Sequence, residues 1–502
     1  MKRLFLFLTL LLIAAVPASA ADIKNLDLGK NAEVWFSEDH TVPIVALVAA
    51  MPAGSAYDPA DKAGLASFAA SLIDEGSGNM DGKAFHEALA DKAIQFRANV
   101  ERDYLVIQVV SLRENMPEAM RLLQTALLHP RFDGEAVNRV RTQIIQSLQE
   151  GESQPPTVAR RAFVKAFFNG HAYGHDSDGD AASLSAVTPD DLRGFARSHW
   201  VRGGLKVAIA GDITAADATK LIGDTFKPVP ETHPAPLPVV GKLGDPGVHI
   251  IAMSVPQPTV IFGLPGIMRA DPDFIPGYVA NYILGGGGFS SRLMDEVRVK
   301  RGLTYGISTQ LTAFNRASIM LGSVATRADA VRQTISVVHD TLANYATKGA
   351  TQQELDDAKT YLTGSFPIAF ASNAGIAAQL STFQRQGLDV GYVARRNSLI
   401  EAVTLSDINR VAKRLFDPAR LTVVVAGSPA DGRAAERPQA PVRPTPPPVV
   451  SVTGATVPGP ASGAPPAPGT GAAAASSPPG VKPVVKPAVK QSVTPPKPAP
   501  PP

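Results

Sequence analysis

The sequence contains no cysteine among its 502 residues. The chain can therefore form no disulfide and offers no thiol as a nucleophile. Hydrophobic residues make up 45% of the sequence, and the length is sufficient for two or more cores of ordinary size. We therefore expect a fold that is stabilised by packing alone.

Apolar runs that could suggest a membrane are scarce, and the clearest one begins the chain. Two basic residues precede an apolar run over residues 4–16, and Ala18-Ser19-Ala20 follows it. This pattern predicts a cleavable secretory signal over residues 1–20 and not a permanent membrane span. No cysteine follows the run to carry a lipid anchor. We expect an exported, soluble protein that begins near Ala21, in a bacterial periplasm or fully secreted.

The end of the chain lacks aromatic residues. From Pro438 onward it holds nearly half of the 44 prolines, and such a segment cannot bury enough apolar surface to offset its ordering entropy. We predict a disordered tail over residues 431–502. Its basic residues outnumber its acids, so the remainder of the chain is mildly acidic and indicates no nucleic-acid partner. The tail is either a solubilising arm or a contact to an anionic envelope polymer through Lys482, Lys486, Lys490 and Lys497.

An internal repeat is present in the rest of the chain. Residues 187–213, "VTPDDLRGFARSHWVRGGLKVAIAGDI", align without a gap with residues 403–429, "VTLSDINRVAKRLFDPARLTVVVAGSP". Each copy predicts a threonine helix cap with an acid three residues later, an amphipathic helix, a turn and a buried strand. We therefore predict two homologous halves, at 21–225 and 247–430, joined by a Pro/Gly-rich linker at 226–246.

Within each half, strands and helices occur in separate runs. Strand patterns come first, and long amphipathic helices follow, for example residues 116–129 and 328–346. This order favours an α+β fold in which each half is a mixed or antiparallel sheet with helices packed on one face. Two such halves facing each other across a linker could form a clamshell chamber.

Clusters that could bind a metal or carry out hydrolysis are hard to find. His171 and His175 are four residues apart, but glycines interrupt any helix there. His86 and Glu87 lack a second ligand at helical spacing. Serine nucleophiles at positions 67 and 71 would need a nearby base, and the sequence shows none. A hydrolase that needs no metal therefore has no specific support.

Three stretches together resemble a known family. They are residues 52–79, "PAGSAYDPADKAGLASFAASLIDEGSGN", residues 169–180, "NGHAYGHDSDGD", and residues 285–308, "GGGGFSSRLMDEVRVKRGLTYGIS". In this order they resemble the pitrilysin/insulinase-type zinc peptidases, or inverzincins, which include the mitochondrial processing peptidases and two-subunit bacterial relatives. The resemblance covers nearly everything between Ala21 and Ala430.

In this family, two histidines and a glutamate on one helix, H-x-x-E-H, hold zinc and activate water. The resemblance places the histidine positions at Ser67 and Ser71 and the glutamate position at Ala70. It places the third ligand, a glutamate on a later helix, at about Ser147. A serine hydroxyl is a poor zinc ligand, and alanine cannot act as a base. The resemblance therefore implies no catalytic residue and no zinc in this chain.

The second half keeps what the family uses to contact its substrate. The resemblance implies that Arg298 and Tyr305 reach a bound peptide from the half opposite the zinc site. A guanidinium offers donors to peptide carbonyls, and a phenol can hydrogen-bond a developing oxyanion. On residue types alone, a solvated arginine and a half-buried strand tyrosine are the simpler interpretation. A glycine run, Gly285, Gly286, Gly287 and Gly288, is expected to be a mobile loop that approaches an extended peptide closely.

These observations predict a catalytically degenerate member of the family. We expect the substrate-binding, non-catalytic subunit of a heteromeric exported peptidase, in which a homologous partner with H-x-x-E-H holds the zinc. The alternative is a peptide-binding or structural envelope protein with no protease partner, comparable to family members that serve as core subunits of a respiratory complex. A working enzyme with a rebuilt site is the third possibility.

Overall fold

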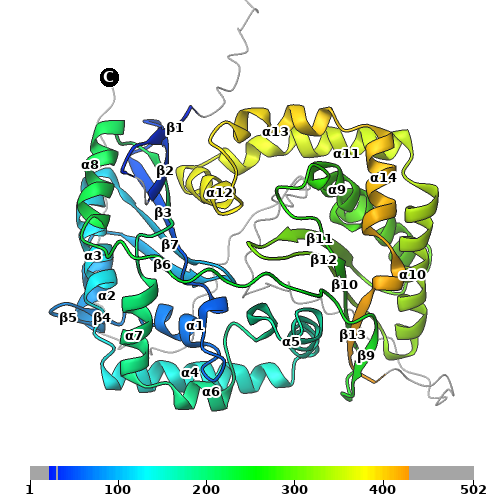
Figure 1. Ribbon diagram of the computed structural model, residues 1–502, viewed down its shortest axis with the longest axis horizontal. Coiled ribbons are helices and arrows are strands. Elements are labelled where there is room, and N and C mark those ends of the chain that lie inside the picture. The colour runs from blue at the N-terminus through cyan, green and yellow to red at the C-terminus, as the bar shows by residue number, and fades with distance from the viewer. Residues whose placement is uncertain (1–21, 30–31, 429–502) are drawn as a thin grey trace, which may run out of the picture. The chain divides into compact units, whose positions relative to one another are not determined.

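Each half of the chain contributes one large β-sheet (Figure 1). The computed structural model describes residues 22–29 and 32–428, so the predicted signal and tail lie outside the described residues. The N-terminal sheet contains β1 Ile23–Leu26, β2 Ala32–Glu38, β3 Ile44–Met51, β6 Gln95–Val100, β7 Leu105–Leu112 and β8 Leu205–Gly211. The C-terminal sheet contains β9 Gly247–Ile251, β10 Thr259–Pro265, β11 Ile307–Ala313, β12 Ser318–Ala325 and β13 Thr422–Ala426.

The two sheets have the same topology. The N-terminal sheet has the order β1-β2-β8-β3-β7-β6, and the C-terminal sheet has the order β9-β13-β10-β12-β11. In each sheet one parallel pair, β2 with β8 or β9 with β13, joins a series of antiparallel pairs. Strand β1 is an addition to the N-terminal sheet. The predicted α+β fold of two homologous halves with mixed sheets is confirmed.

Helices of each half follow the same plan. In the N-terminal half they are α1 Leu65–Ala70, α2 Gly82–Asp91, α3 Met116–Leu128, α4 Gly134–Glu152, α5 Pro155–Phe167, α6 Ala181–Ala186, α7 Pro189–His199 and α8 Ala215–Phe226. In the C-terminal half they are α9 Phe274–Asn281, α10 Val331–Lys348, α11 Gln352–Gly364, α12 Asn373–Arg385, α13 Tyr392–Glu401 and α14 Leu405–Leu415, with π-helical turns η4 Tyr282–Gly286 and η6 Met294–Val299. The hairpin β4 Gly76–Ser77 and β5 Met80–Asp81 lies between α1 and α2.

The segment between the two halves, residues 227–246, forms neither helix nor strand. The boundaries of the halves given above stay a prediction. Within the described residues, none of the helices combines the length and the apolar character that a membrane crossing requires.

The repeat unit begins with the same helix cap in both halves. At α7, the Thr188 hydroxyl accepts from the Asp191 amide at 3.2 Å, and the Asp191 carboxylate accepts from the Thr188 amide at 2.9 Å. At α14, Thr404 and Asp407 repeat this reciprocal pair at 3.1 and 3.0 Å. Two orphan donors are satisfied in each case, so both helices begin where the sequence pattern predicts.

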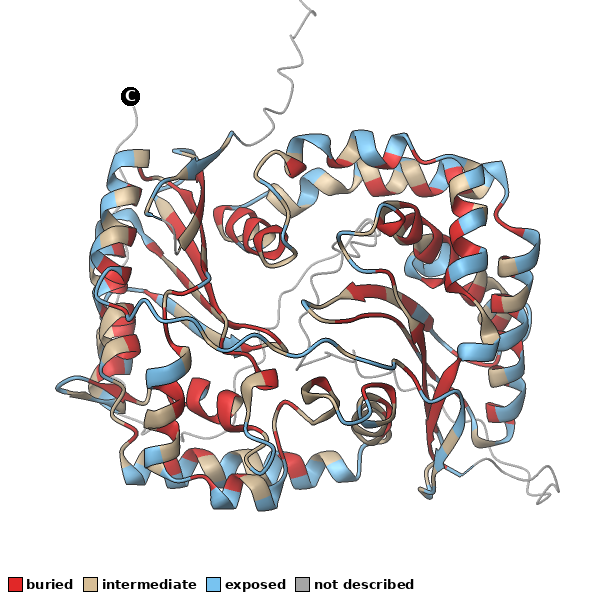
Figure 2. Cartoon of the chain, in the orientation of Figure 1, coloured by how far each residue is buried: buried red, intermediate tan, exposed pale blue. Residues whose placement is uncertain are grey.

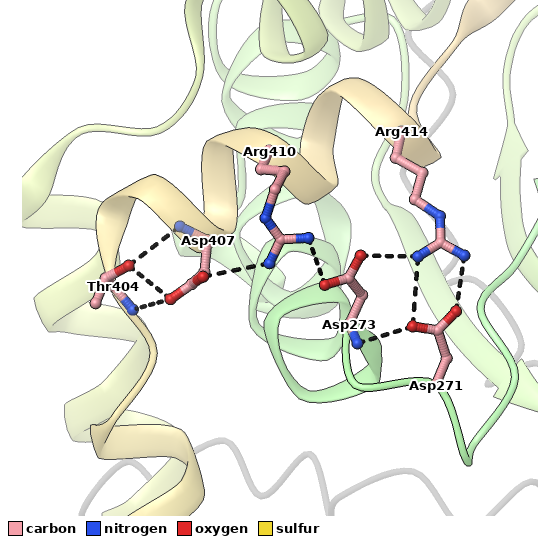
Figure 3. Close-up of polar contacts among 6 residues, drawn as sticks. All are labelled: Asp271, Asp273, Thr404, Asp407, Arg410 and Arg414. Atoms are coloured by element: carbon pink, nitrogen blue, oxygen red, sulfur yellow. Dashed lines mark hydrogen bonds and ion pairs between the residues drawn. The ribbon is translucent and has the colours of Figure 1, made fainter.

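The cap of α14 continues into a chain of ion pairs (Figure 3). Arg410 donates to Asp407 at 3.2 Å and to Asp273 at 2.5 Å. Arg414 donates to Asp273 at 2.7 Å and to Asp271 at 2.7 Å. These contacts join the exposed face of α14 to the turn before α9, while Ile408 and Val411 of α14 are buried in the core.

Central strands of both sheets are buried on both faces, and the second face is covered by a helix from the other half. Helix α12 packs on β3 and β8, and helix α5 packs on β10 and β13 (Figure 1). Beneath α12 the N-terminal sheet presents small side chains, Ala46, Ala208 and Ala210, which let the helix approach closely. Most of α12 is consequently buried (Figure 2).

Polar side chains fix α12 on the N-terminal sheet. The Gln384 amide is fully buried and donates to the carbonyls of Glu33 and Val207 at 3.0 and 3.1 Å. Near the start of the helix, the Asn373 amide donates to the Ile44 carbonyl at 2.9 Å. These bonds give α12 a defined register on the sheet, because a shifted helix would leave buried donors unpaired.

The packing of α5 depends on a glycine in β10. A Cβ added at Gly263 would lie 2.7 Å from the Phe163 ring, which is 1% exposed. Phe163 also stacks on Phe167, with ring centroids 5.2 Å apart, in a cluster with Ile261 and Val424 of the C-terminal sheet. Helices α5 and α12 are thus exchanged between the halves, and the predicted coverage of one sheet face by a half's own helices is only part of the packing.

The exchange of helices predicts that Phe163→Ala destabilises the whole described fold. Truncating a fully buried phenylalanine removes about 3–5 kcal/mol from the free energy of unfolding. The matched control is Lys165→Ala, two residues later and exposed on the same helix, which we expect to change it by less than about 0.5 kcal/mol. Urea denaturation checks both variants, and similar midpoints for the two would contradict the proposed role of Phe163.

The cap of α7 predicts a dependence of stability on pH. A hydrogen bond from Lys62 at 2.5 Å, followed by the bonds from Thr188, lowers the pKa of Asp191 to about 2. The unfolded carboxyl titrates near pH 4, so the folded state binds fewer protons, and this stabilisation is complete above about pH 4 and is lost toward pH 2.

Asp191→Asn should therefore lower the free energy of unfolding at pH 6 by more than it does at pH 3. Denaturation curves at several pH values check this, with Asp190→Asn as control, because the Asp190 side chain is 92% exposed. A loss that stays constant between pH 6 and pH 3 would contradict the assignment.

Candidate functional site

Helix α1 carries the positions that the resemblance identifies with the zinc motif. Gly64 precedes the helix with φ of 90°, and a Cβ there would lie 2.7 Å from the Asp178 carbonyl oxygen. The Asp58 carboxylate accepts from the amides of Gly64 at 2.8 Å and Ala66 at 2.7 Å. His175 Nε2 lies 3.2 Å from the same carboxylate. Burial raises the pKa of Asp58, and the bond to His175 opposes that shift.

Residues 175–183, a loop that runs into the first turn of α6, pack against the start of α1. The Ser67 hydroxyl donates to the Ser177 carbonyl at 2.7 Å, and the Ser183 hydroxyl donates to the Ala63 carbonyl at 2.8 Å. Arg102 donates to the His175 carbonyl at 2.8 Å, and burial lowers the pKa of Arg102 to about 10. The loop and the helix therefore form one hydrogen-bonded unit.

The motif positions themselves hold groups that are already engaged or apolar. Ser67 is half-buried and bonded to the loop, and Ala70 is 5% exposed. Ser71 is exposed, and its hydroxyl donates to the Ser67 carbonyl at 2.8 Å. Across residues 22–29 and 32–428, no group of three or more histidines or acids is arranged to hold a metal ion. At α1 both hydroxyl protons are used within the protein, and alanine supplies no base.

The position predicted for the third ligand lies on α4. Ser147 is exposed there, and the next residue, Leu148, is buried in the same core cluster as Ala70. Ser71 of α1 is exposed as well. The place of Ser147 beside Ser67 and Ser71 stays a prediction.

The histidines that the sequence singled out have structural partners. His171 Nδ1 accepts from the Tyr173 amide at 3.0 Å, and His171 Nε2 lies 2.9 Å from the Pro238 carbonyl. The Tyr173 hydroxyl donates to Asp103. His86 Nε2 lies 3.3 Å from Asp74. Each of these two histidines thus contacts another group of the protein and holds local structure.

Arg298 and Tyr305 lie at and after the second π-helical turn, η6. The Arg298 guanidinium lies over the Phe289 ring, 4.5 Å from its centroid. Phe289 is 70% exposed and Tyr305 is 68% exposed. A cation beside an exposed aromatic ring can bind a peptide through carbonyls and apolar contacts. The simpler interpretation of a half-buried strand tyrosine is wrong, because Tyr305 is exposed and stands in a loop before β11.

Glycines 285–288 do not form a simple loop. Gly285 and Gly286 end the π-helical turn η4, which packs on β11, and a Cβ at Gly285 would lie 2.5 Å from Thr309 Oγ1. Gly285 is buried, while Gly286 and Gly288 are exposed. The first glycine therefore has a packing role that a loop interpretation missed, and the role of the others in peptide binding stays a prediction.

A cavity of about 400 Å³ is lined by residues of α9, β11, α12 and α13 and by residues 101–104. No sequence pattern predicted it. Its polar lining includes Arg269, Asn281 and Arg396. These residues are spread over more than 100 positions and follow no recognisable spacing, so no sequence signal could have assembled them.

The bonding at α1 predicts different effects for its two serines. Ser67→Ala leaves the buried Ser177 carbonyl without its donor and should lower the free energy of unfolding by about 1–2 kcal/mol. Ser71→Ala is the matched control, because its hydroxyl is exposed and bonds only within its own helix turn. Equal losses in urea denaturation would show that the bond from Ser67 to the loop contributes nothing.

Comparisons with known proteins agree with this geometry. Residues 33–178 match the family "Insulinase (Peptidase family M16)", and residues 186–362 match "Peptidase M16 inactive domain". The non-peptidase homolog YmxG of Helicobacter pylori is 26% identical over 432 residues, which cover 85% of this chain and 99% of that protein. An uncharacterized zinc protease YmxG of Bacillus subtilis is 21% identical over 407 residues, which cover 78% of this chain and 96% of that protein.

Solved structures show the same architecture. A peptidase M16 inactive domain from Pseudomonas fluorescens superimposes with a TM-score of 0.77 at 28% identity, over 81% of this chain and 98% of that one. A protease from Helicobacter pylori shares the fold, with a TM-score of 0.73 at 16% identity over 81% of this chain and 99% of that one. With two family domains matched in tandem and the same fold in both neighbours, this chain belongs to peptidase family M16 as a homologue of its inactive, non-peptidase members.

Proposed function

We propose that this chain is the substrate-binding, non-catalytic subunit of an exported peptidase made of two M16 chains. The observation that carries the proposal is the contrast between its two halves. At α1, the motif positions are serine, alanine and serine, and the hydroxyls of Ser67 and Ser71 donate to backbone carbonyls. In the second half, Arg298 of η6 is half-buried and Tyr305, in the loop that follows, is exposed.

A peptide could use the second of these regions without any metal in this chain. The Arg298 guanidinium offers donors to peptide carbonyls, and the Tyr305 phenol can donate to an oxygen on which charge develops. Contact with the Phe289 ring limits the rotamers of Arg298 and leaves less entropy to be lost on binding. These groups bind and orient a substrate, but they cannot activate water.

Hydrolysis would then need a second M16 chain with an intact H-x-x-E-H helix, and the zinc would belong to that partner. Export is supported by the signal pattern of residues 1–20. The basic tail is either a solubilising arm or a contact to an anionic envelope polymer.

The test is reconstitution with the homologue from the same organism that carries H-x-x-E-H. We expect this chain alone to hold no stoichiometric zinc and to cleave no peptide, and the pair to form a complex that does. Chelator-sensitive cleavage by this chain alone would overturn the proposal. Failure to capture such a homologue would favour the alternative, a peptide-binding or structural envelope protein.

In the reconstituted pair, Arg298→Ala and Tyr305→Phe should each lower kcat/KM by about 10- to 100-fold, because each removes a donor to the substrate. The complex itself should persist in size-exclusion chromatography. Lys300→Ala is the control, since Lys300 lies two residues from Arg298, is exposed and pairs only with Asp295 and Glu296 at 2.7 Å. Full activity in both variants would remove the proposed substrate contact.

A further inference from the structure

Two guanidinium groups in the C-terminal half, one buried and one half-buried, have no carboxylate partner among the described residues. Arg396 of α13 is 5% exposed and donates to the Leu362 carbonyl at 3.0 Å and to Asn397 Oδ1 at 2.9 Å. Arg269 donates to Gln386 Oε1 at 3.3 Å. Among the described residues, no acid lies within ion-pair distance of either group. Both therefore carry a positive charge into the protein without a negative one.

Aromatic rings surround the two guanidinium groups. Arg396 lies 4.2 Å from the centroid of the Phe366 ring and 6.0 Å from that of Tyr278. Arg269 lies between the rings of Phe274 and Tyr392, at 4.4 and 4.9 Å. Burial lowers the pKa of Arg269. The rings offset part of the cost of removing these cations from water, but they provide no counter-charge.

Two other arginines of this chain make the ion pair with a carboxylate that Arg269 and Arg396 do not make. Arg292 is also half-buried and lies 4.2 Å from the ring centroid of Tyr345, but it makes a bidentate pair with Glu354 at 2.6 and 2.7 Å. Arg385, close to the same cavity, pairs with Glu101. A carboxylate is thus the feature that the surroundings of Arg269 and Arg396 lack.

Both arginines line the cavity of about 400 Å³, which we call the two-arginine pocket. Phe274, Tyr278, Phe366 and Tyr392 line it as well. Its volume lies within the range of pockets that take small ligands or one to two amino-acid residues. Two carboxylates also line it, but both have partners, because Glu101 pairs with Arg385 and Asp103 accepts from Tyr173 and the Asn315 amide. The pocket therefore combines apolar walls with two cations that have no acid.

Three further polar atoms belong to residues that line the pocket and have no hydrogen-bond partner among the described residues. They are Asn281 Oδ1, Thr309 Oγ1 and Arg385 Nε, and all three atoms are buried within the wall. Buried groups of this kind are normally satisfied, so the wall of this pocket is an unusually polar one.

We propose that the two-arginine pocket binds the free carboxyl terminus of a peptide whose last residue is apolar or aromatic. The carboxylate pairs with Arg269 and Arg396, the last side chain contacts the aromatic walls, and the backbone upstream lies along the wall that contains Asn281 and Thr309. The inference rests on the proposed peptide-binding function, but it needs neither the zinc-bearing partner nor Arg298 and Tyr305. It makes the C-terminus the feature by which this subunit selects a substrate.

The test compares three probes on the full chain by calorimetry. They are an acetylated pentapeptide of four alanines and a C-terminal phenylalanine, the same peptide with a C-terminal amide, and N-acetyl-phenylalanine. The free acid should bind at least about tenfold tighter than the amide, because only the acid offers a full negative charge to the arginines. It should also bind tighter than N-acetyl-phenylalanine, which lacks the upstream backbone.

Variants then place the binding in the pocket. Arg269→Gln should weaken binding of the free-acid peptide by at least about tenfold and remove the difference in affinity between the acid and the amide. Arg396→Lys keeps the buried charge and so guards against misfolding. It should weaken binding of the free-acid peptide less than Arg269→Gln does. Arg395→Gln is the control, because Arg395 is the neighbouring residue, is exposed and already pairs with Asp389 at 2.6 Å.

Each outcome bears on a different claim. Equal binding of acid and amide overturns the carboxylate site, and equal binding of the acid and N-acetyl-phenylalanine overturns the assignment to a peptide in favour of a small aromatic acid. If no probe binds but the reconstituted pair cleaves peptides in an Arg298-dependent way, the pocket inference fails and the proposed function stands. If neither occurs, both fail.

Discussion

The arrangement of this protein depends on the exchange of two helices between its sheets. Strands β3 and β8 are buried on both faces, and their second face carries alanines that admit α12 from the C-terminal half. In return α5 packs on β10, where Gly263 leaves room for the Phe163 ring. Neither sheet could shield this second apolar face with the helices of its own half, so each half completes the core of the other. The exchange also positions the site, because α12 carries Arg385 to Glu101 and forms one wall of the two-arginine pocket.

The region around α1 shows how a fold can keep its shape when the residue types needed for catalysis are absent. Asp58 accepts from the first amides of the helix, and Ser67 ties the helix to the 175–183 loop. These bonds engage the polar groups at the positions where the family has its zinc motif. Stability and catalysis make opposite demands here, because a catalytic group must stay available to a substrate while a structural group gains from being satisfied. At α1 the polar groups are satisfied within the protein, so they serve stability and not catalysis.

Much of the fold follows from local sequence patterns. The parts that do not follow from such patterns have one cause in common. The caps at Thr188 and Thr404 were predictable because threonine and an acid three residues later satisfy the same two amides in both copies. The exchange of α5 and α12 was not, because an amphipathic pattern shows that a helix has an apolar face but not which sheet that face covers. At the site, motif spacing located Ser67, Ala70 and Ser71 on α1, and the place of the third ligand at Ser147 stays a prediction. The two-arginine pocket is a product of tertiary structure alone.

The two regions differ most in how their polar groups are satisfied, and this difference indicates where a ligand belongs. At α1 the hydroxyls of Ser67 and Ser71 and the carboxylate of Asp58 all have partners inside the protein. In the pocket, two guanidinium groups have no acid among the described residues, and three further polar atoms of the wall have no partner there. A folded chain tolerates such costs only where packing elsewhere offsets them or where a bound molecule removes them. A ligand that brings a carboxylate supplies the counter-charge that Arg269 and Arg396 lack, whereas a ligand at α1 would first have to break bonds that hold the helix in place.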